Sequence, residues 1–466
     1  LGERGAHRVQ GADHNRERGC LRKVKRSELP AGARIIQSRF HYKIKRHSAG
    51  EQKLKVKRLK VRLVVQGQHM SKEKGDFVNA FSPVPHLSGV RCCMSIATAN
   101  KWNAFGVNLT QGFIQADLPK GGKTIYITPP PWLNEEADVV YQVMKPLYGM
   151  PHSGRCLHIT WSNWLSSQGF KKVGYEGSMW SRKQGDDHIL IATHVDDSII
   201  TGSNDEKTEA FVKKLLERFD GTCERNLTEM LGMEWVRDVE GGKSELHQVA
   251  FTEKMLKDFG YFEYPKPNKT PQAPNTRLSQ ADQPAEGEVD PKLHRRYRAI
   301  VGALGWLNQG TRPDISHAYA ELSKFVQRPG EKHMEAAEYC LKYLAGSARR
   351  GIKFGGYEED ESSGRGRNQL WEWVDADFAA DLDTRRSHTG YIIMLNGGPV
   401  SWKSCKQKSV SISTAESEWY AASEAGKEVV YLRAILEGKG GNLCSSYEYS
   451  RYFDAIASVG NSQGRW

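Results

Sequence analysis

The sequence lacks the features that define several common protein classes. Its 466 residues contain no apolar run close to the roughly 18 to 20 residues that cross a bilayer, which argues against a membrane-spanning helix. Only eight cysteines are present, and none form a CxxC pair or a Cys/His set with zinc-site spacing. Scattered cysteines are typical of reduced intracellular thiols, so we expect a cytoplasmic or nuclear protein.

The amino-terminal stretch has neither an initiating Met nor an apolar core. Residues 1–20 are polar and basic, so they do not form a secretory signal. The first methionine is Met70. We therefore expect the sequence to begin inside a longer reading frame, although a misplaced gene boundary would look the same.

Positive charge is abundant, and it is concentrated near the beginning of the chain. The net charge is +12, and residues 1–62 hold 19 Lys and Arg against 5 Asp and Glu. Such clusters gain affinity for polyanions by displacing phosphate counterions. Two interpretations stay open on charge alone, a nucleic-acid-binding arm and a disordered solubilising tail.

The length predicts two to four compact units. Composition marks a basic segment at 1–33 that is expected to be disordered, a Pro-rich linker at 264–293 and a second linker at 355–368. A helical unit is expected at 297–344, between the two linkers. The expected strands and helices together give fold class α+β.

Alternating apolar residues predict the strands of the first large unit. Residues 40–44 and 59–65 read as a basic antiparallel hairpin with a turn at 48–50. A helix is expected at 89–101 and a strand at 105–109. 

A second hairpin is expected at 189–202. Its two β-rich runs are separated only by Asp196 and Asp197, and Asn204 is placed to cap the helix that follows. Adjacent aspartates at a tight tip repel one another unless a cation neutralises them. Clustered carboxylates are also what two Mg²⁺ ions need for phosphoryl transfer. Because Asp-Asp is a common turn as well, both interpretations remain open on these residues alone.

The C-terminal unit has its own pattern of strands and one capped helix. Ser413 and Glu416 form a capping-box pair for a helix from Thr414. The expected strands lie at residues 370–374, 390–395, 400–403, 410–412 and 447–453.

Ordered motifs along the chain resemble the Pol polyprotein of copia-type LTR retrotransposons, over about residues 29–454. KVRLV at 60–64 matches the family's KARLV block, LYG stands at 147–149, and HVDD at 194–197 resembles YVDD. Further matching blocks follow the family's order at residues 81–84, 125–130, 231–234, 297–298, 311–315 and 341–344.

The resemblance implies a right-hand polymerase joined to a C-terminal RNase H-like mixed-sheet domain. Residues 34–240 would be fingers and palm, 241–354 thumb and connection, and 369–466 an RNase H-like domain truncated at its C-terminus. The implied activity is that of a nucleotidyltransferase, RNA-directed DNA synthesis coupled to hybrid-RNA degradation. The implied cofactor is Mg²⁺ in two-metal sites, and the implied partners are RNA template, DNA primer, RNA–DNA hybrid and dNTPs. The family's virus-like particle would place this reaction in the cytoplasm.

The resemblance also assigns residues to the substrate. Lys60 and Arg62 would face the nucleotide phosphates, where a guanidinium suits bidentate contact. Tyr148 and Gly149 would lie beneath the nascent base pair. The plainer alternatives are a solvated basic strand, for most of the Lys and Arg neighbours of Arg62, and a simple turn at Gly149. The LYG block departs from the family at three following positions, Pro151, His152 and Gly154.

One departure affects the implied polymerase site. Asp196 and Asp197 match the family's palm ligands, but Asn108 stands where the DVxxAFL block has its aspartate. An amide offers a neutral oxygen and cannot offset a dication as a carboxylate does. Asp117, nine residues later, is too far along the chain to replace it. We hypothesise that polymerase activity is severely reduced or absent in a degenerate copy.

A second metal site is expected in the C-terminal unit. Residues 375–378 and 413–419 resemble the family's SDADWAG and SSTEAEY motifs, which selects Asp375 and Glu418 as catalytic metal ligands. Asp454 would be the third, although the family's DNQxAI is shortened here. Asp377 fits a surface acid instead, and Glu416 fits a residue of the helix cap. A truncated end would leave this nuclease incomplete.

Two other functions are considered. The first is a catalytically silent nucleic-acid-binding remnant, which keeps the basic surface without the metal sites. The second, a structural protein co-opted by a host, has no sequence feature in its favour.

Overall fold

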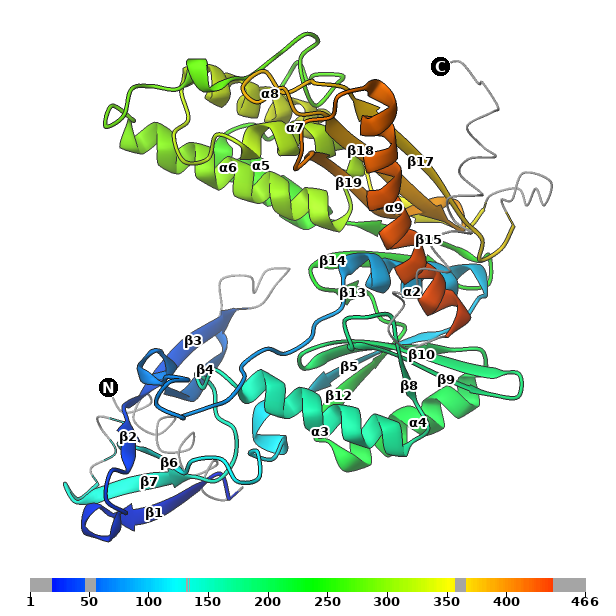
Figure 1. Ribbon diagram of the computed structural model, residues 1–466. Helices are drawn as coiled ribbons and strands as arrows, with labels where there is room; N and C mark the ends of the chain where they lie inside the picture. Colours follow the sequence, from blue (N-terminus) through cyan, green and yellow to red (C-terminus); the bar gives the residue numbers. More distant parts are fainter. Residues whose placement is uncertain (1–18, 47–55, 131–132, 134, 357–365, 439–466) are drawn as a thin grey trace.

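The computed structural model describes residues 19–46, 56–130, 133, 135–356 and 366–438 (Figure 1). Its antiparallel sheets and packed helices confirm the α+β class. The expected turn at 48–50, most of the linker at 355–368, and the expected strand at 447–453 lie outside the described residues.

The basic hairpin forms as expected. β3 (Ser38–Arg46) and β4 (Val56–Val65) pair antiparallel, with Phe40 opposite Leu63. Beside it lies a four-stranded sheet of order β1-β7-β6-β2. Its strands are β1 (Leu21–Lys25), β2 (Arg34–Ile36), β6 (Ile125–Ile127) and β7 (Val139–Val143).

The prediction of disorder throughout residues 1–33 is wrong where β1 forms. β1 pairs antiparallel with β7, and Leu21 and Cys20 are buried. The charged residues of β1 remain exposed while Leu21 enters the core, so the strand is stabilised on one side only.

A six-stranded antiparallel sheet of order β12-β5-β11-β10-β9-β8 carries the acidic hairpin. Alternate residues of β10 enter two different cores, Ile189 and Ile191 on one face and Leu190 and Ala192 on the other. Because both faces are covered, the strand reads as a continuous apolar run. The strands are β5 (Ala104–Leu109), β8 (Lys171–Val173), β9 (Met179–Gln184), β10 (Asp187–His194), β11 (Asp197–Gly202) and β12 (Gly221–Arg225).

Three helices cover this sheet. α3 (Ser153–Ser167) and α4 (Asp205–Arg218) pack on one face, and α2 (Leu87–Ala99) packs on the other (Figure 1). Asn204 caps α4 as predicted, because its Oδ1 accepts the N–H of Lys207 at 3.1 Å. The predicted helix at 89–101 corresponds to α2.

Next to α2 lies a four-stranded antiparallel sheet of order β13-β14-β15-β16. Its strands are β13 (Glu229–Met230), β14 (Met233–Asp238), β15 (Lys243–His247) and β16 (Ile352–Phe354). Trp235, Leu246 and Phe354 place this sheet in the same core as α2.

A helical unit with a separate core follows. It consists of α5 (Val249–Phe259), α6 (Pro291–Gly310), α7 (Ser316–Ser323) and α8 (Glu331–Ser347). The Pro-rich segment is packed against it rather than free, because Leu278 is buried and Asn268 bonds the carbonyl of Tyr339. α6 begins at Pro291, capped by Asp290, inside the expected linker.

The C-terminal unit is a three-stranded antiparallel sheet covered by one helix. It comprises β17 (Leu370–Asp377), β18 (His388–Leu395), β19 (Gly398–Lys406) and α9 (Thr414–Glu437). Ser413 caps α9 as predicted, accepting the N–H of Glu416 at 3.1 Å. The Glu416 carboxylate accepts the N–H of Ile412, not that of Ser413.

The strand expected at 410–412 does not form. Val410 is 54% exposed and Ile412 91% exposed, and no described strand pairs with this segment. Ser411 is buried and donates to Gln407 instead, which folds the segment into a loop. The apolar residues alternate with a polar one in this segment, but no described sheet face buries them.

Candidate active site

The acidic tip, Val195, Asp196 and Asp197, is held in a tight turn between β10 and β11. His194 pairs with Asp197 across the hairpin, and the N–H of Leu109 donates to the carbonyl of Asp196 at 2.8 Å. Val195 has φ +61°, a left-handed conformation that is costly for a β-branched residue, on the order of 1–3 kcal/mol. The tip is therefore a strained backbone conformation that the surrounding sheet enforces.

Asn108 lies directly beside this tip. β5 places it opposite Asp197 in the strand register, and its Nδ2 donates a hydrogen bond to Asp197 Oδ1. An amide can donate where a carboxylate only accepts. The carboxylate oxygen of Asp197 is therefore engaged by a protein N–H rather than left for a cation.

Asp117 is engaged elsewhere. Its Oδ1 lies 2.5 Å from Lys145 Nζ, and this lysine lowers the pKa of the Asp117 carboxyl below its ordinary value. Its backbone N–H points to Thr160 Oγ1 at 3.4 Å. These partners agree with the expectation that Asp117 does not replace the missing aspartate.

Arg62 and Tyr148 lie together near the acidic tip. The Arg62 guanidinium is 5.0 Å from the centre of the Tyr148 ring, and that ring is 5.0 Å from Phe113. Burial raises the pKa of Tyr148; the nearby charge of Asp196 raises it too, while Arg62 lowers it. Arg62 Nε is buried and has no hydrogen-bond partner among the described residues. Lys60 lies in β4, but its side chain is outside the described part.

Gly149 brings the backbone of this loop against β4. Its φ is +89°, and a Cβ there would lie 2.1 Å from the carbonyl oxygen of Val65. The adjacent Tyr148 carbonyl accepts the Val65 N–H at 2.8 Å. Only glycine fits this position without displacing the strand.

The C-terminal unit brings Asp375 and Glu418 together. Asp375 lies in β17 and Glu418 near the start of α9, which packs on β17. Burial, and then the charge of Asp375, raise the pKa of Glu418 above its ordinary value. Two carboxylates this close favour a bound cation. Asp454 lies outside the described residues.

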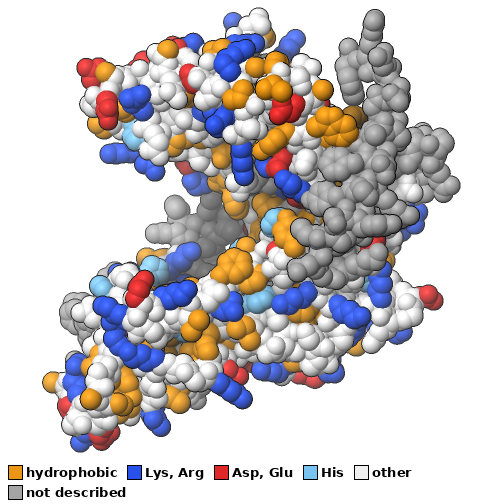
Figure 2. Space-filling model, in the orientation of Figure 1, with side chains coloured by type: hydrophobic (Ala, Val, Ile, Leu, Met, Phe, Trp, Pro, Cys, Tyr) orange, Lys and Arg blue, Asp and Glu red, His pale blue; other side chains and the backbone are white. Residues whose placement is uncertain are grey.

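The surface is hollowed between the helical unit α5–α8 and the part that carries β3 and β4. Figure 2 shows Lys and Arg side chains on both sides of this hollow. No described helix is long and apolar enough to cross a membrane.

A family model described as reverse transcriptase (RNA-dependent DNA polymerase) matches residues 23–273, which span the basic hairpin, Asn108 and the acidic tip. The chain belongs to the reverse transcriptases of copia-type retrotransposon Pol polyproteins. 

Curated relatives extend the likeness of this reverse transcriptase beyond the matched residues. It is 30% identical over 437 residues to "Retrovirus-related Pol polyprotein from transposon TNT 1-94" of Nicotiana tabacum, covering 93% of this chain and 31% of the relative. It is 29% identical to the polyprotein from transposon RE1 of Arabidopsis thaliana, covering 88% of this chain and 26% of the relative. The chain thus spans about a third or less of these polyproteins.

One solved structure also overlaps the reverse transcriptase. It is titled "Structure of the foamy viral protease-reverse transcriptase dRH in complex with ds DNA", with a TM-score of 0.48 and 12% identity, over 97% of this chain and 68% of that chain.

Two residues of this reverse transcriptase received no role from the sequence but lie at the site. Phe113 packs on Tyr148, and His152 is buried and stacks on Phe77 with ring centres 5.9 Å apart. Burial lowers the pKa of His152. The sequence showed only that both residues lie inside motif blocks, and this position does not predict which side chains they pack against.

Proposed function

We propose that this chain is a degenerate RNA-directed DNA polymerase with an associated RNase H, and that Asn108 has removed most of its polymerase activity. The observation that carries the proposal is the hydrogen bond from the Asn108 amide to the Asp197 carboxylate. In a metal-dependent site the same position would contribute negative charge and an oxygen ligand.

The donor set fits a two-metal polymerase site only in part. Asp196 and Asp197 supply hard oxygen ligands of the kind Mg²⁺ prefers, but the third group is neutral and donates a hydrogen bond to Asp197. Bound Mg²⁺ would lower the pKa of the attacking hydroxyl and stabilise charge on the transferring phosphate. Asn108 weakens the negative field that would hold such ions.

The substrate side of the proposed polymerase is better preserved. Arg62, held against the Tyr148 ring, has a planar guanidinium suited to the phosphates of a dNTP. Gly149 allows the loop backbone to lie close to β4, where a side chain would clash. The basic sides of the hollow in Figure 2 suit RNA template, DNA primer and their hybrid.

We propose RNase H activity for the C-terminal unit. Asp375 in β17 and Glu418 in α9, which packs on β17, would bind Mg²⁺. Asp454 would be the third ligand. Here the donors fit the cation, because both described groups are carboxylates and the charge of Asp375 disfavours ionisation of Glu418 without one. The resemblance further suggests that the reaction takes place in a cytoplasmic virus-like particle.

The decisive experiment is Mg²⁺-dependent primer extension on an RNA template with the full chain and Asn108→Asp. We expect Asn108→Asp to extend primers at least about a hundred-fold faster, because the metal's charge stabilisation is worth several kcal/mol. Asn226→Asp is the matched control, since it adds the same charge in the exposed turn at the far end of β12. Equal rates for wild type and Asn108→Asp would contradict the inactivation proposal.

The alternative function is a silent nucleic-acid-binding remnant, which the basic hollow favours. It predicts that primer–template binds while Asn108→Asp still fails to extend and hybrid RNA is not cleaved. Cleavage of hybrid RNA by wild type that disappears in Glu418→Gln would instead support the nuclease proposal.

A further inference from the structure

Three potential metal ligands meet where α7 approaches β18. Asp377 lies opposite His388 in the β17–β18 register, so this cluster is two residues along the strand from Asp375 and does not include it. His317 and Glu321 lie one helical turn apart on α7, so they share a face. His388 begins β18. One ligand atom from each residue lies within 4.8 Å of the other two.

His388 is oriented by its own hydrogen bond. Its Nε2 lies 2.8 Å from Ser404 Oγ, and its Nδ1 lies 3.6 Å from Glu321 Oε1. Metal binding through Nδ1 requires the tautomer in which Nε2 carries the proton, and the contact with Ser404 Oγ gives that proton an acceptor. Metal-binding histidines are typically fixed in this way, by an outer partner on the second ring nitrogen.

The spacing suits a small cation. Ligand atoms about 2.0–2.1 Å from a tetrahedral Zn²⁺ are about 3.3 Å apart, close to the 3.6 Å between His388 Nδ1 and Glu321 Oε1. The His317 ring is 5.0 Å from the His388 ring, and a ligand atom of His317 lies within 4.8 Å of those of Glu321 and His388.

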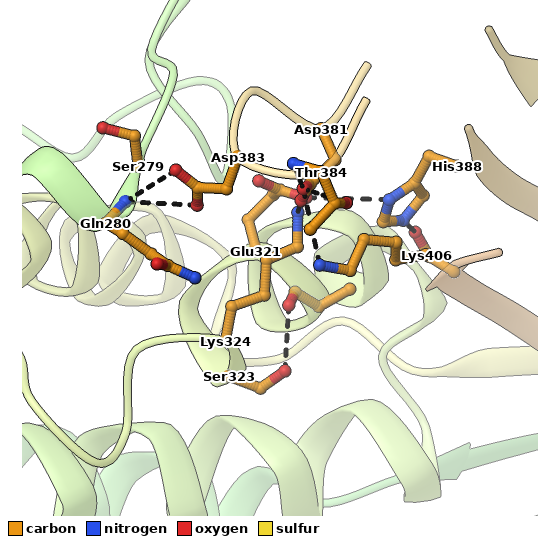
Figure 3. Close-up of polar contacts among 12 residues, drawn as sticks. Ser279, Gln280, Glu321, Ser323, Lys324, Asp381, Asp383, Thr384, His388 and Lys406 are labelled. Atoms are coloured by element: carbon orange, nitrogen blue, oxygen red, sulfur yellow. Dashed lines mark hydrogen bonds and ion pairs between the residues drawn. The ribbon is translucent and has the colours of Figure 1, made fainter. Parts of the chain in front are cut away.

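The surrounding charges leave Glu321 able to accept an ion. Lys324 Nζ lies 2.6 Å from Glu321 Oε1 and 2.9 Å from Asp381 Oδ2, and Lys406 lies 3.4 Å from Asp381 Oδ1 (Figure 3). Because Asp381 also pairs with Lys324, a cation on Glu321 does not leave the lysine without a partner.

The cluster opens into a cavity of about 360 Å³. His317, Glu321, His388 and Asp377 all line it. That volume accommodates water molecules as further ligands, so the three side chains need not close the coordination shell by themselves.

We propose that His317, Glu321 and His388 bind one divalent transition-metal ion of the Zn²⁺ class, which links α7 to β18. Two imidazoles and one carboxylate match the ligands that Zn²⁺ takes, whereas Mg²⁺ prefers oxygen alone. The ion joins the helical unit to the C-terminal sheet. This site is independent of the proposed polymerase and nuclease functions.

The test is titration of the metal-free full chain with Co²⁺ and Zn²⁺, followed by visible absorption and calorimetry. Wild type is expected to bind one ion with the intense d–d bands of tetrahedral Co²⁺. His317→Ala and His388→Ala should weaken binding by more than the roughly 10- to 100-fold typical of losing an outer partner, and Ser404→Ala should fall within that range. Since His317 is exposed, His317→Ala should keep the fold intact.

His247→Ala is the matched control. His247 faces Glu234 at 3.8 Å, a histidine–carboxylate pair with no third ligand in the described clusters. Its loss should leave the Co²⁺ spectrum and affinity unchanged. A wild-type chain that binds no Co²⁺, or variants that all keep the same affinity and spectrum, would overturn the proposal.

Discussion

At the scale of single residues, the backbone around the acidic tip keeps a tight turn with an amide beside it where the family's motif has a carboxylate. Val195 still adopts the left-handed turn and Gly149 still meets β4, while Asn108 has replaced the expected carboxylate. A change from Asp to Asn alters charge with almost no change in shape. The packing that holds the tip therefore does not depend on the missing charge.

Gly149→Ala should destabilise the chain strongly. The new Cβ would lie 2.1 Å from the Val65 carbonyl oxygen in addition to the cost of φ +89°. We expect a loss above about 2 kcal/mol, measured by chemical denaturation. Gly121→Ala is the control, since it has φ +75° but nothing within 4 Å of its Cβ. If both variants lose the same stability, the steric explanation fails.

Asp375→Asn should stabilise the C-terminal unit only when Glu418 is ionised. The folded pKa of Glu418 is raised above its ordinary value, so its charged form is disfavoured and stability falls as pH rises through the raised pKa. Removing the Asp375 charge relieves the part of that penalty that Asp375 causes, while the part due to burial remains. Melting temperatures should therefore separate at about pH 7 and converge at about pH 4. A constant difference across this range would contradict the coupling.

The same pair offers a test of metal binding that does not need turnover. Added Mg²⁺ should lower the pKa of Glu418, as followed by NMR, in wild type but much less in Asp375→Asn.

At the scale of elements, local patterns were sufficient where partners lie close in sequence. The β10–β11 hairpin, the β3–β4 hairpin and the capped helices α4 and α9 all follow from alternation, helical spacing and caps. Each of these needs only a neighbouring segment or its own residues.

Elements with distant or absent partners could not be predicted in this way. β1 is a strand because β7 supplies its pairing and its core, 120 residues further along the chain, as shown by the Arg22–Gln142 pair. Residues 410–412 have the alternation but no partner strand among the described residues, and they form a loop. Pairing across the chain is therefore the information that a local pattern omits.

The candidate sites divide in the same way. Asp196, Asp197 and Asn108 could be placed together only through the family's ordered motifs, and Asp375 with Glu418 likewise. The cluster of His317, Glu321 and His388 could not be foreseen, because its third member lies at the start of β18 and reaches α7 only where the C-terminal sheet packs against that helix through β19. The spacing of four between His317 and Glu321 was the only local signal.

Ser413→Ala should weaken α9. Ser413 Oγ accepts the Glu416 N–H, and removing a serine N-cap costs typically about 1 kcal/mol. Ser413→Gly should cost only a few tenths of a kcal/mol, because glycine is itself an acceptable cap. Urea midpoints would measure both. Equal losses in the two variants would show that the hydroxyl is not what stabilises the helix end.

At the scale of the whole molecule, Arg91 joins three parts of the chain. It lies buried in α2 and donates to the carbonyls of Val400 at 2.8 Å, Gln309 at 2.6 Å and Gly310 at 3.0 Å, with the Trp402 ring 4.0 Å away. Burial lowers the pKa of its guanidinium to about 9. The hydrogen bonds therefore offset a substantial desolvation cost.

Arg91→Ala should cost at least about 3 kcal/mol, because it leaves three carbonyls without their donor, and the bonds to two of them are buried. Arg91→Lys should recover only part of this, since an ammonium cannot reach three oxygens with the same planar geometry. Arg295→Ala, on the exposed side of α6, is expected to change stability by less than about 0.5 kcal/mol. Denaturation midpoints compare the three. Wild-type stability in Arg91→Ala would show that the hydrogen bonds of Arg91 contribute little to the free energy of unfolding.

The core around α2 has a consequence for shortened copies of the retrotransposon. α2 is enclosed by the six-stranded sheet on one side and by β19 and α9 on the other. A stop codon between β16 and β17 would not release a smaller, self-sufficient polymerase. It would leave apolar side chains of α2 in water, and such a product is a substrate for chaperones and proteolysis or a seed for aggregation.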